Sequence, residues 1–176
     1  MLSTLRDAWK IPELRNKIIF TLIMLLIYRL GTFIPVPYID TEVLQQYIAD
    51  GGMLGLFDIM SGGNFSNFTI FAMSITPYIN SSIIMNLLTF AIPSLERLAK
   101  EGEEGRKKIT QYTRYLTILL AIVQALGIAL SFSNILTEKS WMTISIVILT
   151  ITAGTAFLMW LGEQITESGI GNGISL

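Results

Sequence analysis

The sequence of 176 residues contains no cysteine and no histidine. Without cysteine there are no disulfides or thiolate metal sites, and without histidine the commonest general base, pH switch and metal ligand is missing. Charged residues are also scarce, at 14% of the chain, against about 25% in an average soluble domain. We therefore expect a membrane protein rather than an enzyme, with no catalytic residue, bound metal or cofactor.

Hydrophobic residues are abundant, at 52% of the chain. They gather in four stretches, at residues 16–36, 74–92, 115–132 and 141–161. Each stretch is close to the roughly 20 residues that a membrane-spanning helix needs. The net charge of −1 gives no basic excess of the kind that indicates nucleic-acid binding. The pattern predicts an all-α membrane protein with four transmembrane helices.

The distribution of lysine and arginine predicts how these helices are oriented. Basic residues gather near the N-terminus and in the 93–114 connection, whereas residues 36–72 contain none. Because basic loops stay in the cytoplasm, we expect the N-terminus and the 93–114 loop on that side and the 37–73 loop outside. Residues 1–15 have the apolar side of a short helix that lies on the cytoplasmic surface.

A short apolar segment, Met53–Met60, lies in the external loop and is followed by the break Ser61-Gly62-Gly63-Asn64. It is too short to cross a membrane, because a spanning helix needs about 20 residues. Non-helical backbone at membrane depth is tolerated only where it lines a cavity or is buried in protein. A half-inserted helix beside such a break therefore suggests a pathway through the bilayer.

The second span combines an apolar repeat with polar residues. Ser74 and Pro77 have the chemistry of a helix start, so we expect Ser74 to cap this helix. Ile75, Ile79 and Ile83 recur every four residues and share one face. Polar residues follow on neighbouring positions, namely Asn80, Ser81, Ser82 and Asn86. They serve either as contacts between helices or as a face turned to water, and the sequence leaves both interpretations open.

Arg29 is a charged residue inside the first span. It lies about 18 Å from Lys17 along a helix. A charge within a membrane span indicates function by default. The alternative is that the side chain extends to the membrane surface or bonds to carbonyl groups of a neighbouring helix.

Several strings together resemble one family, SecY, the large subunit of the bacterial protein-conducting channel. The strings, in the order of the family, are Arg29–Pro37, Met60–Gly63, Ile75–Ile79, Glu101–Lys108, Gln111–Tyr115, Trp160–Glu167 and Gly169–Ser175. The resemblance covers the chain from about residue 10 to its end. A full-length member has ten spans in two halves, so we expect this chain to be the N-terminal half. Residues 162–176 would then be a cytoplasmic loop and a truncated start of span five.

The resemblance implies a role for several groups of residues. The plug that closes the channel from outside would be Met53, Leu54, Leu56, Phe57, Ile59, Met60, Ser61, Gly62 and Gly63. The aliphatic pore ring would include Ile75 and Ile79. The lateral gate, through which signal sequences enter lipid, would include Asn80, Ile83, Asn86 and Gln124. Arg106, Lys107 and Lys108 would form a basic cytoplasmic loop.

The implied function is a passive conduit for secretory proteins across, and membrane proteins into, the bacterial cytoplasmic membrane. The implied partners are SecE, SecG, the motor SecA, the ribosome, signal sequences, unfolded secretory chains and the lipid bilayer. The sequence has no Walker-type phosphate-binding motif, which favours a conduit over a motor. The alternative is a small-solute or ion transporter, since broken helices are typical of those proteins too.

Overall fold

The computed structural model describes residues 11–49, 53–132, 136 and 140–176. Its helices are α2 (Pro12–Gly31), α3 (Thr41–Ala49), α4 (Met53–Met60), α5 (Thr76–Ala91), α6 (Pro93–Lys100), α7 (Glu103–Ser131) and α8 (Trp141–Ser168). Apart from two isolated β-bridges, the regular secondary structure of these residues is helical, which confirms the predicted all-α fold. Most of the predicted interfacial helix over residues 1–15 lies outside the described residues.

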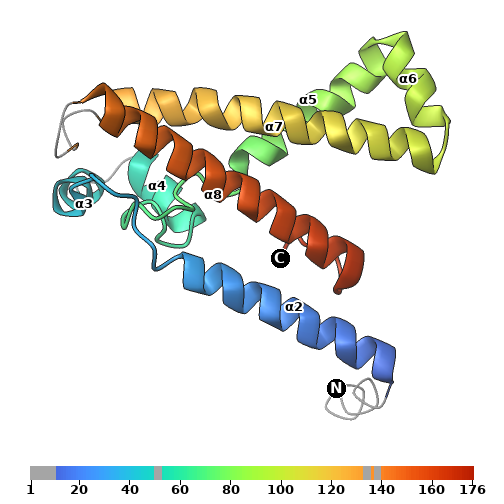
Figure 1. Cartoon of the computed structure of the whole chain (residues 1–176), viewed down its shortest axis with the longest axis horizontal. Coiled ribbons are helices and arrows are strands. Elements are labelled where there is room, and N and C mark those ends of the chain that lie inside the picture. Colours follow the sequence, from blue (N-terminus) through green and yellow to red (C-terminus); the bar gives the residue numbers. More distant parts are fainter. Residues whose placement is uncertain (1–10, 50–52, 133–135, 137–139) are drawn as a thin grey trace.

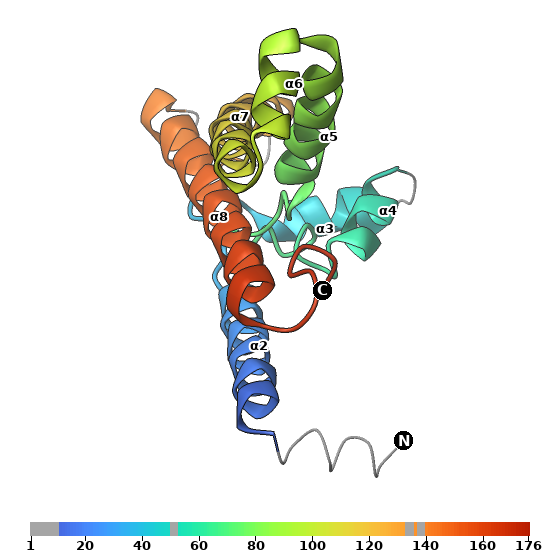
Figure 2. The ribbon, with the colours of Figure 1, turned by 90° about the vertical axis from the view of Figure 1, so that its right-hand side faces the viewer.

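The long helices form a splayed bundle around α7 and α8 (Figure 1). α7 packs against α5 on one side and α8 on another, and α2 packs against α8. Figure 2 shows α3 and α4 beside the start of α5, with α4 directed away from α8. The helices therefore pack closely along α7 and α8, whereas α4 and the start of α5 lie at a side of the bundle that α8 does not cover.

Two helices of the described chain, α7 and α8, are long and apolar enough to cross a membrane. A third crossing is possible if the bent pair α5 and α6 is counted as one span. α2 has 20 residues, but it carries Glu13, Arg15, Lys17 and Arg29. The uncharged part of α2 between Lys17 and Arg29 is thus shorter than the roughly 30 Å hydrocarbon core of a bilayer.

Small residues let α7 approach its neighbours closely. Its buried positions recur every four residues from the middle to the end of the helix, at Thr113, Thr117, Ala121, Ala125 and Ala129. The three alanines belong to the same apolar cluster as Val147 and Ile151 of α8. Such small side chains are typical of packed helices in membranes, where tight contact replaces the hydrophobic effect as the driving force.

α5 runs from Thr76 to Ala91, whereas the sequence predicted a span over residues 74–92. The residue that precedes the helix is Ile75, and no side chain caps it, so the prediction that Ser74 is the cap is wrong. Ser74 instead takes a φ of 52° and donates its backbone N–H to Phe71. Pro77 does lie in the first turn, as expected. At the other end Pro93 starts α6, and the chain bends by 101° between the two helices, because proline cannot donate the next helical hydrogen bond.

The turn segment, residues 61–75, connects α4 to α5 without regular structure and is packed deeply into the bundle. Its backbone pairs with the extended residues after α2, through Val36 N–H to Phe68 O at 2.9 Å and Ile70 N–H to Ile34 O at 3.0 Å. A Cβ at Gly154 of α8 would collide with the carbonyl oxygen of Ile70. Glycine is therefore what allows the turn segment to lie directly on α8.

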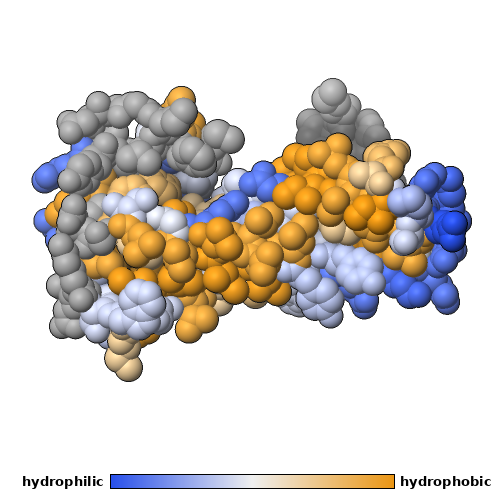
Figure 3. All heavy atoms as spheres, turned by 90° about the horizontal axis from the view of Figure 1, so that it is seen from above, coloured by the Kyte–Doolittle hydropathy of each residue, from blue (hydrophilic) through white to orange (hydrophobic). Residues whose placement is uncertain are grey.

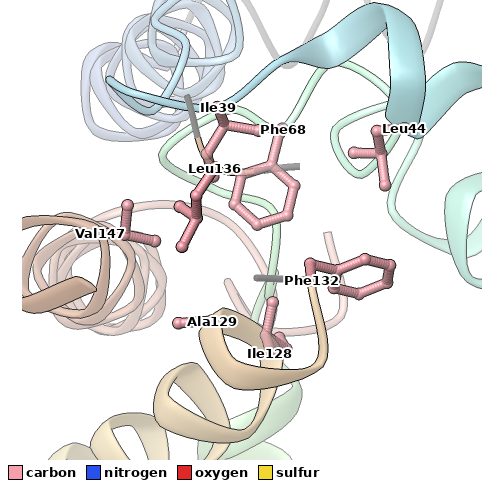
Figure 4. Close-up of a pocket in the computed structure, with 8 residues that line it drawn as sticks. All are labelled: Ile39, Leu44, Phe68, Ile128, Ala129, Phe132, Leu136 and Val147. Carbon is pink, nitrogen blue, oxygen red and sulfur yellow. The ribbon is translucent and has the colours of Figure 1, made fainter. Parts of the chain in front are cut away.

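Phe68 anchors the turn segment in an apolar cluster. Figure 4 shows its ring among side chains from the loop before α3, from α3, from α7 and α8, and from the connection between them. Phe68 is 2% exposed, although its φ of 41° is unusual for a residue with a Cβ. Burial of the ring is worth about 1.5–3 kcal/mol, which offsets a backbone strain of about 1–3 kcal/mol. The cluster leaves a void of only about 10 Å³, which excludes a ligand.

The molecular surface divides into apolar and polar parts. Figure 3 shows a broad hydrophobic face and a hydrophilic end on the right, where α6 and the start of α7 lie. Large apolar side chains are exposed along both long helices, including Leu119 and Leu126 of α7 and Leu149 of α8. A soluble monomer rarely exposes a continuous apolar face of this kind, so the face is suited to lipid or to another apolar partner.

Candidate functional site

The main functional candidate is an open groove of about 620 Å³ beside the start of α5. Three elements form its walls: the turn segment, the first turns of α5 and the C-terminal part of α7. The side chains that line it are Ser61, Phe65, Ala72, Met73, Ser74, Ile75, Thr76, Ile79, Asn80, Gln124, Gly127, Ile128, Ser131 and Phe132. The groove is thus mainly apolar, with a few amide and hydroxyl groups.

Ile75 and Ile79 both line the groove, one helical turn apart. Ile79 is 43% exposed, and its N–H bonds to the Ile75 carbonyl at 3.1 Å. The buried face of α5 is instead made by Pro77, Ser81 and Met85. The two isoleucines therefore do not belong to the face that packs against neighbouring helices.

The polar residues predicted beside these isoleucines separate into two groups. Asn80 of α5 and Gln124 of α7 both line the groove, so the structure brings them to one site. Ile83, 54% exposed, and Asn86 lie further along α5 and do not line the groove. Ser81 is fully buried and donates to the Pro77 carbonyl at 2.8 Å. Of the two interpretations of the polar stripe, contact between helices fits Ser81, and a face turned to the groove fits Asn80.

The predicted plug residues form α4 and the start of the turn segment. Leu56 and Ile59 are 63% and 77% exposed, so α4 is held by few contacts along these positions. Ser61 lines the groove, while Gly62 and Gly63 follow it with φ values of 66° and 81°, which favour glycine. The side chains of the remaining predicted plug residues, Met53, Leu54, Phe57 and Met60, lie outside the described part of the chain.

Asn64 is one residue that sequence reasoning missed. It is 3% exposed and its side chain makes three hydrogen bonds. The amide donates to the Tyr28 hydroxyl at 3.1 Å and to the Ser61 carbonyl at 2.7 Å, and its oxygen accepts from the Thr69 hydroxyl at 3.0 Å. We refer to Asn64 with Tyr28, Ser61 and Thr69 as the Asn64 network. It fixes the turn segment internally and joins it to α2.

A second contact between distant residues joins α7 to α8. Arg114 donates from Nε to Glu163 Oε1 at 2.8 Å. The side chain of Glu163 is only 12% exposed, so the pair is shielded on that side. Sequence reasoning assigned neither residue to a pair, because the two positions lie 49 residues apart. Their only sequence signal was that both stand inside the motifs that carried the family resemblance.

The comparison with known proteins identifies the chain's relatives. The family model for SecY matches residues 69–176. The protein translocase subunit SecY of Bacillus subtilis is 49% identical over 185 residues, an alignment that covers all of this chain and 42% of that protein. The chain belongs to the SecY family. The SecY subunit of Streptomyces griseus is 50% identical and that of Aquifex aeolicus 48%, each aligned over the whole chain and 44% of the relative. The chain thus spans less than half the length of these SecY relatives.

Solved channel structures share the fold. Sec61 in the canine ribosome–channel complex from the endoplasmic reticulum aligns with a TM-score of 0.64 at 21% identity, over 98% of this chain and 39% of that one. A structure described as showing that the plug domain of SecY stabilises the closed state of the translocation channel aligns with a TM-score of 0.61 at 22% identity, over 98% of this chain and 38% of that one. At these identities the likeness establishes the SecY fold alone.

The three basic residues, Arg106, Lys107 and Lys108, lie on the first turns of α7 and are exposed. The segment predicted as the 93–114 loop of SecY is therefore largely helical. Gly105 precedes the basic residues and permits close packing, because a Cβ there would collide with the carbonyl oxygen of Leu98 in α6. The basic cluster lies at the opposite end of α7 from Gln124, which lines the groove.

The described residues contain no group of three acidic side chains placed to hold a metal ion. The groove likewise presents no carboxylate or lysine that a reaction could use, since its polar members are serine, threonine, asparagine and glutamine. What the groove offers chemically is a flexible apolar surface with weak hydrogen-bonding groups at its edge. Such a surface can contact many different side chains without holding any of them tightly.

Proposed function

We propose that this chain forms part of the pore-forming subunit of a protein-conducting channel. It would act as a passive conduit for secretory proteins across the bacterial cytoplasmic membrane and for membrane proteins into it. The observation that carries the proposal is the groove, where Ile75 and Ile79 are turned away from the packed face of α5 in a chain of the SecY family.

The apolar character of this site suits a conduit. A translocating polypeptide presents every kind of side chain, so a specific polar site would retain some sequences. Aliphatic side chains can close around any of them, and a narrow hydrophobic constriction also excludes ions because water leaves it. We assign Ile75 and Ile79 to such a ring, which the remainder of the full-length protein would complete.

The membrane arrangement that we propose has four crossings. α2, α5, α7 and α8 would be these spans, with the N-terminus and the α6–α7 tip in the cytoplasm. The exposed cations Arg106, Lys107 and Lys108 at this tip support the orientation. In this arrangement the short uncharged part of α2 would be accommodated by local thinning of the bilayer.

The plug and the gate follow from the same arrangement. α4 and residues 61–63 would close the channel from outside, and the exposed positions of α4 support a segment that can move. Asn80, Ile83, Asn86 and Gln124 would form this chain's side of the lateral gate. Hydrogen bonds between membrane helices average only about 0.6 kcal/mol, which suits a gate that must open often.

The partners would be those of a translocation channel. We propose SecE and SecG as companion subunits, and SecA and the ribosome as cytoplasmic partners that bring signal sequences and unfolded chains. The similarity to Sec61 in a ribosome–channel complex supports the ribosome. The rival interpretation, a small-solute or ion transporter, is not supported, because the family match is to SecY and the groove has no acidic residue to bind a coupling ion.

Photo-crosslinking to a stalled secretory chain tests this function. A photoreactive residue replaces Ile79 in the complete channel, and the matched control replaces Leu149 of α8, which is 66% exposed on the apolar face. We expect the stalled chain to crosslink at position 79 and to leave position 149 unlabelled. Equal labelling at both positions would refute the assignment of the groove to the translocation path.

A further inference from the structure

Arg29 lines a second hollow, distinct from the groove, which we call the Arg29 pocket. It has a volume of about 490 Å³ and lies where the end of α2, the start of α3 and the turn segment meet. Ten residues line it, among them Thr32, Phe33, Thr41 and Asn67. None of the ten is acidic, so the one charge that faces the pocket is a guanidinium.

The pocket offers hydrogen-bond donors for an anion. Among the described residues, Arg29 takes part in no ion pair, and none of its five side-chain N–H groups donates a hydrogen bond to them. The Asn67 side-chain amide donates one N–H to the Gly63 carbonyl at 3.1 Å, and its second N–H donates to no other described residue. The Thr41 hydroxyl forms no hydrogen bond with the rest of the described chain. A guanidinium with adjacent amide and hydroxyl donors matches the geometry of a phosphate or carboxylate.

The surface beside Arg29 suits one kind of anion. Leu22, Leu26 and Arg29 are spaced by four and three residues, so they share one face of α2. The two leucines are 56% and 61% exposed, and Phe33 beyond the helix end is 74% exposed. A phospholipid has the matching order of groups, since its phosphate is joined through the glycerol backbone to two acyl chains.

The length of α2 supports the same ligand. Arg29 lies about 18 Å from Lys17 along the helix, whereas the hydrocarbon core of a bilayer is about 30 Å thick. A helix that is too short for the bilayer is accommodated by local thinning, which brings head groups toward its charged end. A lipid phosphate drawn inward at this helix would meet Arg29 at the mouth of the pocket.

We propose that the Arg29 pocket binds the phosphate of an anionic phospholipid from the outer leaflet, with an acyl chain along Leu26 and Leu22. The proposal rests on the membrane placement of α2 but not on the conduit function of the groove. An acidic side chain from another part of the complete protein, or free phosphate, would be a different occupant of the same donors, and the experiment below separates these cases.

Fluorescence quenching by brominated lipids tests the proposal in the complete channel protein. All native tryptophans are replaced by phenylalanine, and Phe33→Trp provides a reporter at the pocket. The protein is reconstituted in vesicles that contain brominated phosphatidylglycerol or brominated phosphatidylcholine. We expect the reporter to prefer phosphatidylglycerol by about fivefold, the contribution of one arginine near anionic lipid. Arg29→Gln should reduce the preference to about onefold, whereas the control Arg97→Gln, an exposed cation of α6, should preserve it.

The outcomes separate the possible occupants. Preference that survives Arg29→Gln overturns the proposal, and so does a reporter that neither lipid quenches, since protein then covers this face. Equal quenching by the two lipids, together with a change in reporter fluorescence on addition of millimolar glycerol phosphate, would assign the pocket to free phosphate instead. If the Arg29→Gln protein fails to assemble, the protein with Arg29 intact still tests the proposal. Equal quenching of its reporter by brominated phosphatidylglycerol and brominated phosphatidylcholine contradicts lipid binding at the pocket. The crosslinking at position 79 is independent of all these results.

Discussion

Replacement of Asn64 by alanine should loosen the turn segment and with it the seal of the closed channel. The substitution removes three hydrogen bonds, one of them to Tyr28 of α2. It also leaves the hydroxyl of Thr69, a residue that is 2% exposed, without its acceptor. A neutral hydrogen bond contributes about 0.5–1.5 kcal/mol and an unsatisfied buried group costs about 1–3 kcal/mol. Because bonds of one network do not add fully, we expect a total loss of about 2–4 kcal/mol.

Amide hydrogen exchange in the complete channel measures this loss directly. The Thr69 N–H donates to the Asn64 carbonyl at 3.0 Å, so it reports on local opening of the turn segment. A loss of about 2–4 kcal/mol corresponds to exchange that is roughly 30- to 700-fold faster. In planar bilayers the same variant should pass small ions in the absence of substrate. Tyr28→Phe removes only one bond of the network and should have a smaller effect, of about 1 kcal/mol.

Asn67→Ala provides a matched control. Asn67 lies in the same segment but is exposed, and its side chain makes a single bond to the Gly63 carbonyl. We expect its effect on the exchange of the Thr69 amide to stay below about threefold, since an exposed hydrogen bond is readily replaced by water. If Asn64→Ala changed exchange and conductance no more than Asn67→Ala, the Asn64 network would not hold the turn segment.

Two further predictions concern the groove and the packing of the turn segment. Replacement of both Ile75 and Ile79 by serine should make the complete channel leak small ions in planar bilayers, because a polar ring no longer excludes water, and an unchanged conductance would contradict the pore-ring assignment. Gly154→Ala should destabilise the protein by about 1–3 kcal/mol, since the new Cβ collides with the Ile70 carbonyl. Gly127→Ala, where a Cβ meets no atom within 4 Å, is its control in thermal unfolding. Equal thermal unfolding midpoints for Gly154→Ala and Gly127→Ala would show that the turn segment is not in close contact with α8 at Gly154.

The sequence was sufficient to predict the features that depend on local pattern. Hydropathy located α7 and α8, and the same helices are the two that are long and apolar enough to cross a membrane. The four-residue repeat predicted that Ile75 and Ile79 share a face, and the glycine-rich break predicted the end of α4. Such predictions need only the local sequence; spacing along a helix, for example, fixes which residues lie together, whatever the rest of the chain does.

Features that depend on distant partners could not be predicted. Asn64 looked like one more residue of a turn, because its partner Tyr28 lies 36 residues away. The role of Gly154 was also hidden, since glycine in a membrane helix is common and only the Ile70 carbonyl explains it. The prediction for Ser74 was wrong for a related reason, since the bonding of the preceding residues holds it at a positive φ before the helix begins.

The contacts of the turn segment also indicate which part of it can move. Residues from Phe68 onward are held by backbone bonds to the extended chain after α2, by the buried ring of Phe68 and by the contact with Gly154. Before Phe68, the one hydrogen bond from a side chain of the turn segment to α2 is that from Asn64 to Tyr28, among the described residues. Displacement of α4 with residues 61–63 leaves these contacts in place, whereas displacement up to residue 67 also breaks the bonds of Asn64 to Tyr28 and Thr69. It would in addition withdraw Phe65, which is 7% exposed and contacts the ring of Phe132 at a centroid distance of 6.1 Å. The proposed plug, α4 with residues 61–63, would thus move while the start of α5, and with it Ile75 and Ile79, stays in place.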